Sequence, residues 1–238
     1  MEFNPFDSSN ELDPLESFDG LARLFPLPNV VLFPGALLPL HIFEPRYREL
    51  VADAMDTDRL ITMVLLKPGS EDDYEGNPPI YEVGCLGQII HHEPMEDGRS
   101  NLILRGLCRV HIDNEESNDR LFRTAQVTIL EDSYPDSDSE GISQPVSRVL
   151  ETMQEILTLV GRSGDAEKIA AAGEVPAGRL CDLACHCLGF DVHVKQSLLA
   201  ELKVARRAET LLAWMQAMLQ TIQRRVRPTG HPPEFSQN

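Results

Sequence analysis

The fold is decided by residues 24–50, LFPLPNVVLFPGALLPLHIFEPRYREL, in which strand-forming apolar residues are interrupted at short intervals by prolines. These prolines stand at positions 26, 28, 34, 39 and 45. A proline cannot donate a hydrogen bond to a sheet ladder, so Pro26, Pro28 and Pro39 are expected at strand ends, edges or bulges. Short, bent strands of a small barrel meet that requirement.

Two local signals within this stretch predict a turn and a helix. Pro34 presets φ at the second position of a type II turn over residues 33–36, and Gly35 supplies the positive φ of the third position. Pro45 suits the first turn of a helix, and Glu44 places a carboxylate at the positive end of that helix. We therefore expect the chain to reverse at Gly35 and to form a helix over residues 45–55.

Apolar patterns after this helix predict further strands. Residues 60–67 are apolar on both faces, which favours a strand covered on each side. Residues 81–92 and 102–112 read as an antiparallel pair joined through an Asp-Gly turn at 96–99. Three glycines predict sharp bends in this pair: Gly84, Gly87 and Gly106. A last strand is expected to turn its apolar residues inward: Leu121, Ala125, Val127 and Ile129.

The sequence divides into a β half and a helical half, an α+β class, with a tail at each end. Residues 1–20 are acidic and lack Lys and Arg, which favours a mobile tail, although apolar residues there could dock on the protein or on a neighbour. Residues 21–132 form the predicted barrel subdomain and residues 143–227 the helical one. An acidic segment with Pro135 separates them. Residues 228–238 are expected to be flexible.

Helical periodicity runs through the second half. Ser143 is a candidate N-cap for the first helix, and short helices are expected over residues 165–172 and 176–189. One long final helix carries an apolar stripe from Leu198 to Val226. Residues 195–227 have a net charge of +5, against −22 for the rest. This helix could present a solvated face, dock on an acidic surface, close a bundle or pair with a second copy as a homodimer.

Composition limits the class of protein. The chain has 238 residues, of which 42% are hydrophobic and 25% charged, as in ordinary soluble domains. No apolar run reaches membrane-spanning length, and the acidic beginning is unlike a secretory leader. The net charge of −17 opposes binding to nucleic acid or an anionic membrane. Five cysteines in apolar contexts are expected to be reduced, which together with the missing leader favours a cytoplasmic protein.

Three ordered blocks of the sequence resemble the amino-terminal domain of the Lon protease family. The first comprises Leu27-Pro28, VVLFPG and HIFEPRY, the second is YEVGCLGQI at 81–89, and the third is DGRSNL at 97–102. A looser likeness continues into the helical half. The resemblance implies a PUA-like, Lon N-domain type of barrel. It also implies a non-catalytic module that binds exposed apolar segments of other proteins.

The catalytic signatures of a Lon protease are not found in the sequence. No glycine is followed by lysine, so a Walker A phosphate loop is absent. Residues 161–164, GRSG, lack the GxSxG spacing of a nucleophile elbow and read as a helix end. The chain ends where the resemblance would place the ATPase, so we expect a stand-alone module that is not an enzyme.

Residues that could bind metal are poorly spaced for it. Cys185, His186 and Cys187 would point in different directions on a helix, so they cannot converge on one ion even with Cys181 on a shared face. The acidic loop at 69–79 lacks the ligand order of an EF-hand, and residues 91–93, HHE, are not an HExxH motif. We expect no metal and no cofactor.

Two functional hypotheses remain. In the first, the module acts as an adaptor or holdase for unfolded or regulatory client proteins, alone or with a protease or chaperone. Its contact residues would lie at the proline-rich turns and on the outer side of the sheet, and the named candidates are Phe33, Pro34, Phe43 and Tyr47. In the second, the barrel holds a small-molecule or hydrolytic pocket. There an anionic ligand would meet three residues on one strand face: Arg105, Arg109 and His111.

Overall fold

The computed structural model describes residues 14–16, 18–69, 77–135, 140–171 and 175–226. The chain forms two compact units, which are described separately. Unit 1 comprises Met1–Glu131 and Cys185–Leu202, and unit 2 comprises Asp132–Ala184 and Lys203–Asn238. The expectations for residues 1–13, for the acidic loop at 70–76 and for the C-terminal tail lie outside the described residues. No helix in the described part is long and apolar enough to cross a membrane.

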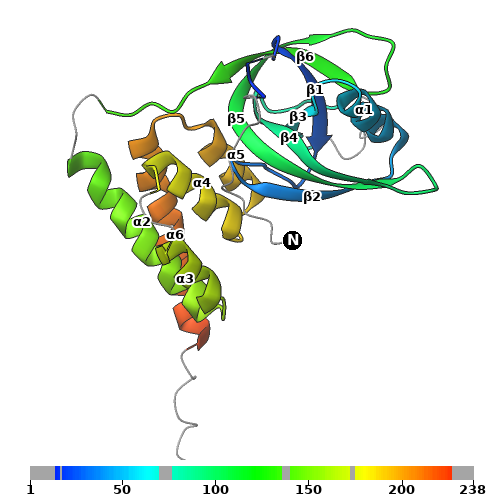
Figure 1. The fold of residues 1–238 in the computed structure, drawn as a ribbon. Helices are drawn as coiled ribbons and strands as arrows, with labels where there is room; N and C mark the ends of the chain where they lie inside the picture. The colour runs from blue at the N-terminus through cyan, green and yellow to red at the C-terminus, as the bar shows by residue number, and fades with distance from the viewer. Residues whose placement is uncertain (1–13, 17, 70–76, 136–139, 172–174, 227–238) are drawn as a thin grey trace, which may run out of the picture. The chain divides into compact units, whose positions relative to one another are not determined.

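Unit 1 contains one mixed sheet, which has six strands in the described part of the chain (Figure 1). The strands are β1 (Leu21–Leu27), β2 (Leu37–Ile42), β3 (Leu60–Leu65), β4 (Val83–Pro94), β5 (Ser100–Glu116) and β6 (Arg123–Leu130). Their order is β2-β5-β4-β3-β1-β6, and β6 also pairs with β5. The sequence predicts a small barrel. The structure shows a mixed sheet bent far enough to bring β6 onto β5, while β2 lies at an edge, so the sheet does not close through all six strands.

The turn and helix predicted in residues 24–50 are confirmed. Gly35 has φ 68°, and the Ala36 N–H donates to the Phe33 carbonyl at 3.0 Å. The Gly35 N–H donates to the Gly106 carbonyl at 2.6 Å, which fastens the turn to β5. A Cβ on Gly106 would lie 2.2 Å from the Phe33 carbonyl oxygen, so this close approach requires glycine. Helix α1 spans Pro45–Met55 with Glu44 as its N-cap.

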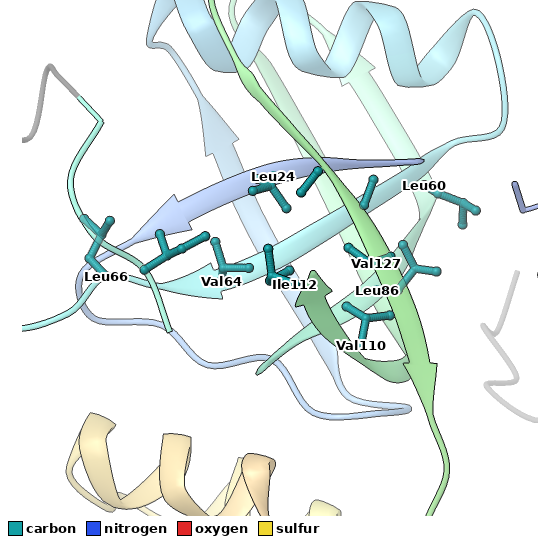
Figure 2. Close-up of a cluster of buried hydrophobic side chains, with 11 residues drawn as sticks. Leu24, Leu60, Val64, Leu66, Leu86, Val110, Ile112 and Val127 are labelled. Atoms are coloured by element: carbon teal, nitrogen blue, oxygen red, sulfur yellow. The ribbon is translucent and has the colours of Figure 1, made fainter. Parts of the chain in front are cut away.

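The core of unit 1 collects apolar side chains from most of the strands. Every residue of β3 is buried, as expected for a strand covered on both faces. Figure 2 shows Leu24, Val64 and Leu86 beside Val110, Ile112 and Val127. Leu15 and Phe18 pack against this cluster, so part of the predicted tail is docked on the sheet.

The last predicted strand is shorter than expected. Strand β6 begins at Arg123, which leaves Leu121 in the preceding loop with 61% of its surface exposed. Ala125 and Val127 point inward as predicted, but Ile129 is exposed.

Helix α5 (Val192–Ala200) belongs to unit 1 although it follows most of the helical half in sequence. Gln196 Nε2 donates to the Val83 carbonyl at 2.8 Å, and Arg109 Nε donates to the Leu199 carbonyl at 2.8 Å. The two bonds join α5 to β4 and β5.

The predicted apolar stripe from Leu198 to Val226 does not lie on one unbroken helix, because it crosses a break in the backbone. Helix α5 ends at Ala200, and α6 spans Val204–Val226. Between them Lys203 forms a β-bridge with Ser133, and the Val204 N–H donates to the Ser133 carbonyl at 3.0 Å. The break is stabilised by these backbone bonds to a distant segment, so helix propensity alone does not reveal it.

Unit 2 is helical. It contains α2 (Glu140–Leu159), α3 (Ser163–Ala171), most of α4 (Ala177–Cys187) and α6. Helix α2 packs against α3 and α6, and it begins at Glu140, before the expected cap Ser143. The buried residues of these helices include Val149, Met153, Ile156, Leu157, Leu180, Cys181, Ala208, Leu211 and Met215.

A buried arginine lies inside unit 2. The Arg207 side chain is 0% exposed, and its two terminal nitrogens donate to Asp132 at 2.9 and 2.6 Å. Asp182 on α4 lies 3.7 Å from Nε. Burial alone would lower the Arg207 pKa, but the hydrogen bonds that it donates to Asp132 and the two carboxylate charges raise it, so the guanidinium stays charged. The network joins the start of unit 2 to α4 and α6.

Candidate functional site

The four residues proposed for protein contact have different environments. Phe33 is 0% exposed, and Tyr47 is buried, with its hydroxyl donating to the Pro26 carbonyl at 2.6 Å. The Tyr47 ring also stacks on Phe25 at 3.9 Å. Phe33 and Tyr47 are therefore core residues. Pro34 is half-buried, whereas Phe43 is 58% exposed and is accessible to a partner.

Phe43 borders a sheet surface that β2, β5 and β4 form together, here called the outer face. The pairing register arranges it in three cross-strand rows. In order from one end, the rows are Leu37, Arg105 and Gln88, then Pro39, Ile103 and His91, then His41, Asn101 and Glu93. Residues with the opposite side-chain direction are in the core, as alternation along a strand requires: Ile42, Ile89, Leu102 and Leu104.

Burial changes along the outer face. All three residues of the Leu37 row are half-buried. In the other two rows Ile103 and Asn101 are half-buried, and the remaining four residues are exposed. Phe43 continues the exposed end, since its ring lies 6.1 Å from that of His41. The outer face is therefore less exposed at Arg105 than at Phe43, and Leu37, Pro39 and Ile103 supply apolar surface along it.

The row of His41, Asn101 and Glu93 is ordered by hydrogen bonds. Asn101 Nδ2 donates to the Glu93 carboxylate at 3.5 Å, so its Oδ1 faces His41 Nδ1 at 2.8 Å. An amide oxygen only accepts, so His41 Nδ1 carries the proton and donates. This bond orients the His41 ring beside Phe43.

Strand β2 pairs with β5 along one side, and no described strand pairs with its other side. The Gly106 N–H donates to the Ala36 carbonyl, and the register then places Leu38, Leu40 and Ile42 in hydrogen-bonded pairs with β5. Pro39 therefore has its nitrogen toward the free edge, where a missing N–H interrupts pairing with another strand. A partner at this position would be held by side-chain contacts with the outer face more than by a continuous ladder.

The three residues proposed for an anion site do not share a partner in the described part of the chain. Arg105 Nη2 donates to Gln88 Oε1 at 2.7 Å. Arg109 is buried against α5, where it donates to Leu199. His111 Nδ1 lies 2.8 Å from Asp113, and the bonds from Thr128 and His111 lower the pKa of the Asp113 carboxyl. Arg105 alone belongs to the outer face.

A second polar cluster in unit 1 involves α1. Asp53 receives Arg23 Nε at 2.5 Å and also pairs with Arg120 from the loop between β5 and β6. Burial alone would raise the pKa of the Asp53 carboxyl, but the hydrogen bonds from the two arginines lower it overall. In the same loop the Leu121 N–H donates to Glu49 at 3.3 Å. These contacts position the loop on α1.

The cysteine-rich segment gives no metal cluster in the described residues, where no group of three or more His, Cys, Asp and Glu side chains could hold an ion. Cys185 is buried, and Lys195 Nζ lies 3.5 Å from the His186 carbonyl. Burial lowers the pKa of both His186 and Lys195. The sequence alone does not indicate that Lys195 approaches His186, because the two residues lie on different helices. Nor does it indicate that Pro39 and Ile103 lie side by side, because this depends on the pairing of β2 with β5.

The fold is that of Lon N-terminal domains. A Lon N-terminal domain protein from Xanthomonas campestris matches with a TM-score of 0.61 and 27% identity, over 82% of this chain and 98% of that one. The N-terminal domain of a Mycobacterium avium complex Lon protease matches with a TM-score of 0.65 over the same shares, at 14% identity, which shows the fold alone.

The family model of the ATP-dependent protease La (LON) substrate-binding domain matches residues 22–217, so the chain belongs to this family. Lon protease from Desulfosudis oleivorans is 24% identical over 84% of this chain and 24% of its own length. Lon protease from Cytophaga hutchinsonii is 26% identical over 87% of this chain and 25% of its own length. The chain thus spans about a quarter of the length of these curated relatives.

Proposed function

We propose that this protein binds substrate proteins by accepting exposed apolar segments on the outer face and Phe43. The family is a substrate-binding domain, and the relatives are proteases. The observation that supports the placement is the 58% exposure of Phe43 beside an outer face that carries Leu37, Pro39 and Ile103. Large exposed apolar side chains that adjoin one another mark interaction surfaces.

The chemistry of this binding is burial of apolar surface. An extended client segment that crosses β2 and β5 would cover Phe43, Pro39 and Ile103, which removes both partners from water. Burying a phenylalanine completely is worth about 1.5–3 kcal/mol, and Phe43 is already partly covered, so its contribution is about 1 kcal/mol. The energy comes from contact alone, and the client would be held without nucleotide. This behaviour suits an adaptor that presents clients to a protease or a holdase that prevents aggregation.

Binding of a permanently unfolded, carboxymethylated client protein tests the proposal. Phe43→Ser should weaken binding roughly fivefold to tenfold in fluorescence anisotropy, because it removes the exposed aromatic contact. Ile129→Ser is the matched control, since Ile129 is also an exposed apolar residue of unit 1 but lies on β6. Equal affinity of Phe43→Ser and the parent protein would contradict the placement. Failure of the parent to bind several unfolded clients would contradict the function itself.

We also propose that the protein forms a homodimer through α6. A cytoplasmic location is a separate proposal. Trp214 is exposed on α6, which leaves an aromatic side chain available for a helix contact. Light scattering of the full chain against Trp214→Ser tests the dimer. A monomer mass for both proteins would remove it.

A further inference from the structure

Arg105 stands at the less exposed end of the outer face with unused hydrogen-bonding capacity. Its Nη2 donates to Gln88 Oε1 at 2.7 Å, which fixes the guanidinium plane. Its Nε is buried and has no hydrogen-bond partner. A guanidinium has five N–H donors and cannot give up its charge at physiological pH. Because Nε is shielded from solvent, a ligand would reach the guanidinium through its terminal nitrogens, and a half-buried cation gains from an acceptor there.

Arg105 differs in this respect from several other arginines of unit 1. Arg23, Arg99 and Arg123 each contact a carboxylate, at 2.5, 2.6 and 2.5 Å. Arg105 contacts a neutral amide and forms no ion pair with any described residue. The chain contains 38 acidic side chains, so carboxylates are abundant, yet none of those in the described part of unit 1 completes this site.

We propose that Arg105 binds the free C-terminal carboxylate of an apolar client segment. This inference rests on the proposed function and names the class of segment that the outer face prefers. A carboxylate is the planar acceptor that a guanidinium binds with two parallel hydrogen bonds. Leu37 pairs with Arg105 on β2, and Ile103 lies two residues away on β5, in the next row, so the residues before the client's terminus meet apolar side chains.

The shape and charge of the outer face select a chain terminus over an internal acidic residue. The Arg105 row is half-buried throughout, whereas His41 and Glu93 at the far end are exposed. A terminus needs room for the chain on one side only, while an internal residue needs it on both, so the less exposed end favours a terminus. At the opposite end of the outer face, the Glu93 carboxylate would repel the client's terminal carboxylate. This repulsion favours the orientation in which the client's carboxylate lies at Arg105.

Three labelled peptides with the same apolar ending, Leu-Phe-Val-Leu, distinguish the sources of the carboxylate. The first has a free α-carboxylate, the second a C-terminal amide, and the third the amide together with an internal glutamate. The free acid should bind the full-length protein about tenfold more tightly than the amide, which is the effect of one charge-assisted contact. Arg105→Gln should remove that difference. Arg99→Gln, which makes the same change of net charge in the exposed β4–β5 turn, should keep it.

Each other outcome has a definite meaning. Equal binding of acid and amide overturns the carboxylate site while the apolar binding of the proposed function stands. Binding of the glutamate peptide as tight as that of the free acid overturns the assignment to a terminus. Loss of the difference in Arg99→Gln as well shows that net charge, not Arg105, causes it. No binding of any peptide overturns this inference, and unfolded protein clients then decide whether the proposed function survives. Thermal unfolding of both variants confirms that the comparison is between folded proteins.

Discussion

At the scale of single residues, the stretch 24–50 shows what side-chain type does and does not reveal. Gly35 and Pro34 produce the turn because their backbone preferences are local. The aromatic residues behave differently: Phe33 and Tyr47 are core residues, and Phe43 is exposed. All three lie in the same proline-rich stretch. The prolines interrupt the alternation of inward and outward side chains that would otherwise distinguish buried from exposed positions. Choosing the contact residue therefore requires the pairing register.

Gly35→Ala should destabilise unit 1 by about 1–2 kcal/mol, because a Cβ is strained in the left-handed region where Gly35 has φ 68°. Urea unfolding followed by circular dichroism measures the loss. Gly189→Ala is the matched control in the same unit, since a Cβ on Gly189 would meet no atom within 4 Å and its φ is not positive. An unchanged midpoint for Gly35→Ala would show that the turn relaxes without strain.

At the scale of elements, local signals predict those elements whose stability is local. Helix α1 begins at Pro45 and ends at Met55 as predicted, and β3 is buried on both faces as its apolar run indicates. The break between α5 and α6 is not predictable in this way, because Glu201 and Lys203 suit a helix and the deciding bond comes from Ser133. The prediction that Leu121 points inward on the last strand fails for a similar reason. Its loop follows contacts with α1, so the alternation of β6 does not extend to it.

The contact between α1 and that loop makes a prediction about pH. The pKa of Asp53 is lowered from 3.8, so its stabilising contribution is complete above the unfolded-state pKa and is lost as the pH falls through the lower folded-state value. Asp53→Asn should therefore be less stable than the parent by about 1 kcal/mol near neutral pH, and the gap should narrow below about pH 4. Thermal unfolding across this range provides the measurement.

The control for this experiment is Asp119→Asn, which neutralises an exposed carboxylate in the same loop. It should follow the parent at every pH. A gap for Asp53→Asn that stays constant down to pH 3 would mean that the ionised carboxylate does not provide the stability, and that side-chain packing does.

At the scale of the whole molecule, the sequence predicts one division between strands and helices, and the structure divides the chain differently. The acidic segment after Glu131 does separate the units, but residues 185–202 return to unit 1. The return depends on two side chains with partners about a hundred positions away, Gln196 with Val83 and Arg109 with Leu199. The sequence predicts Arg109 as a ligand-binding residue because alternation along the strand places it on one face with Arg105. Its role in the structure is to hold α5, which a pattern of charges along one strand cannot show.

Unit 1 therefore includes α5, which packs against the sheet. Removing the contact between them should destabilise both α5 and the strand beside it. Arg109→Met deletes the bond to the Leu199 carbonyl inside a buried site, at a cost of about 1–3 kcal/mol. Hydrogen–deuterium exchange should rise in α5 and in the adjoining part of β4, because these amides then open more often. Leu198→Ala, which removes a buried side chain from α5 itself, should raise exchange in the same two segments. Arg99→Met, in an exposed turn, should leave them protected. If Arg109→Met changed exchange in β5 alone, α5 would be held by its apolar contacts, and the arginine would serve only its own strand.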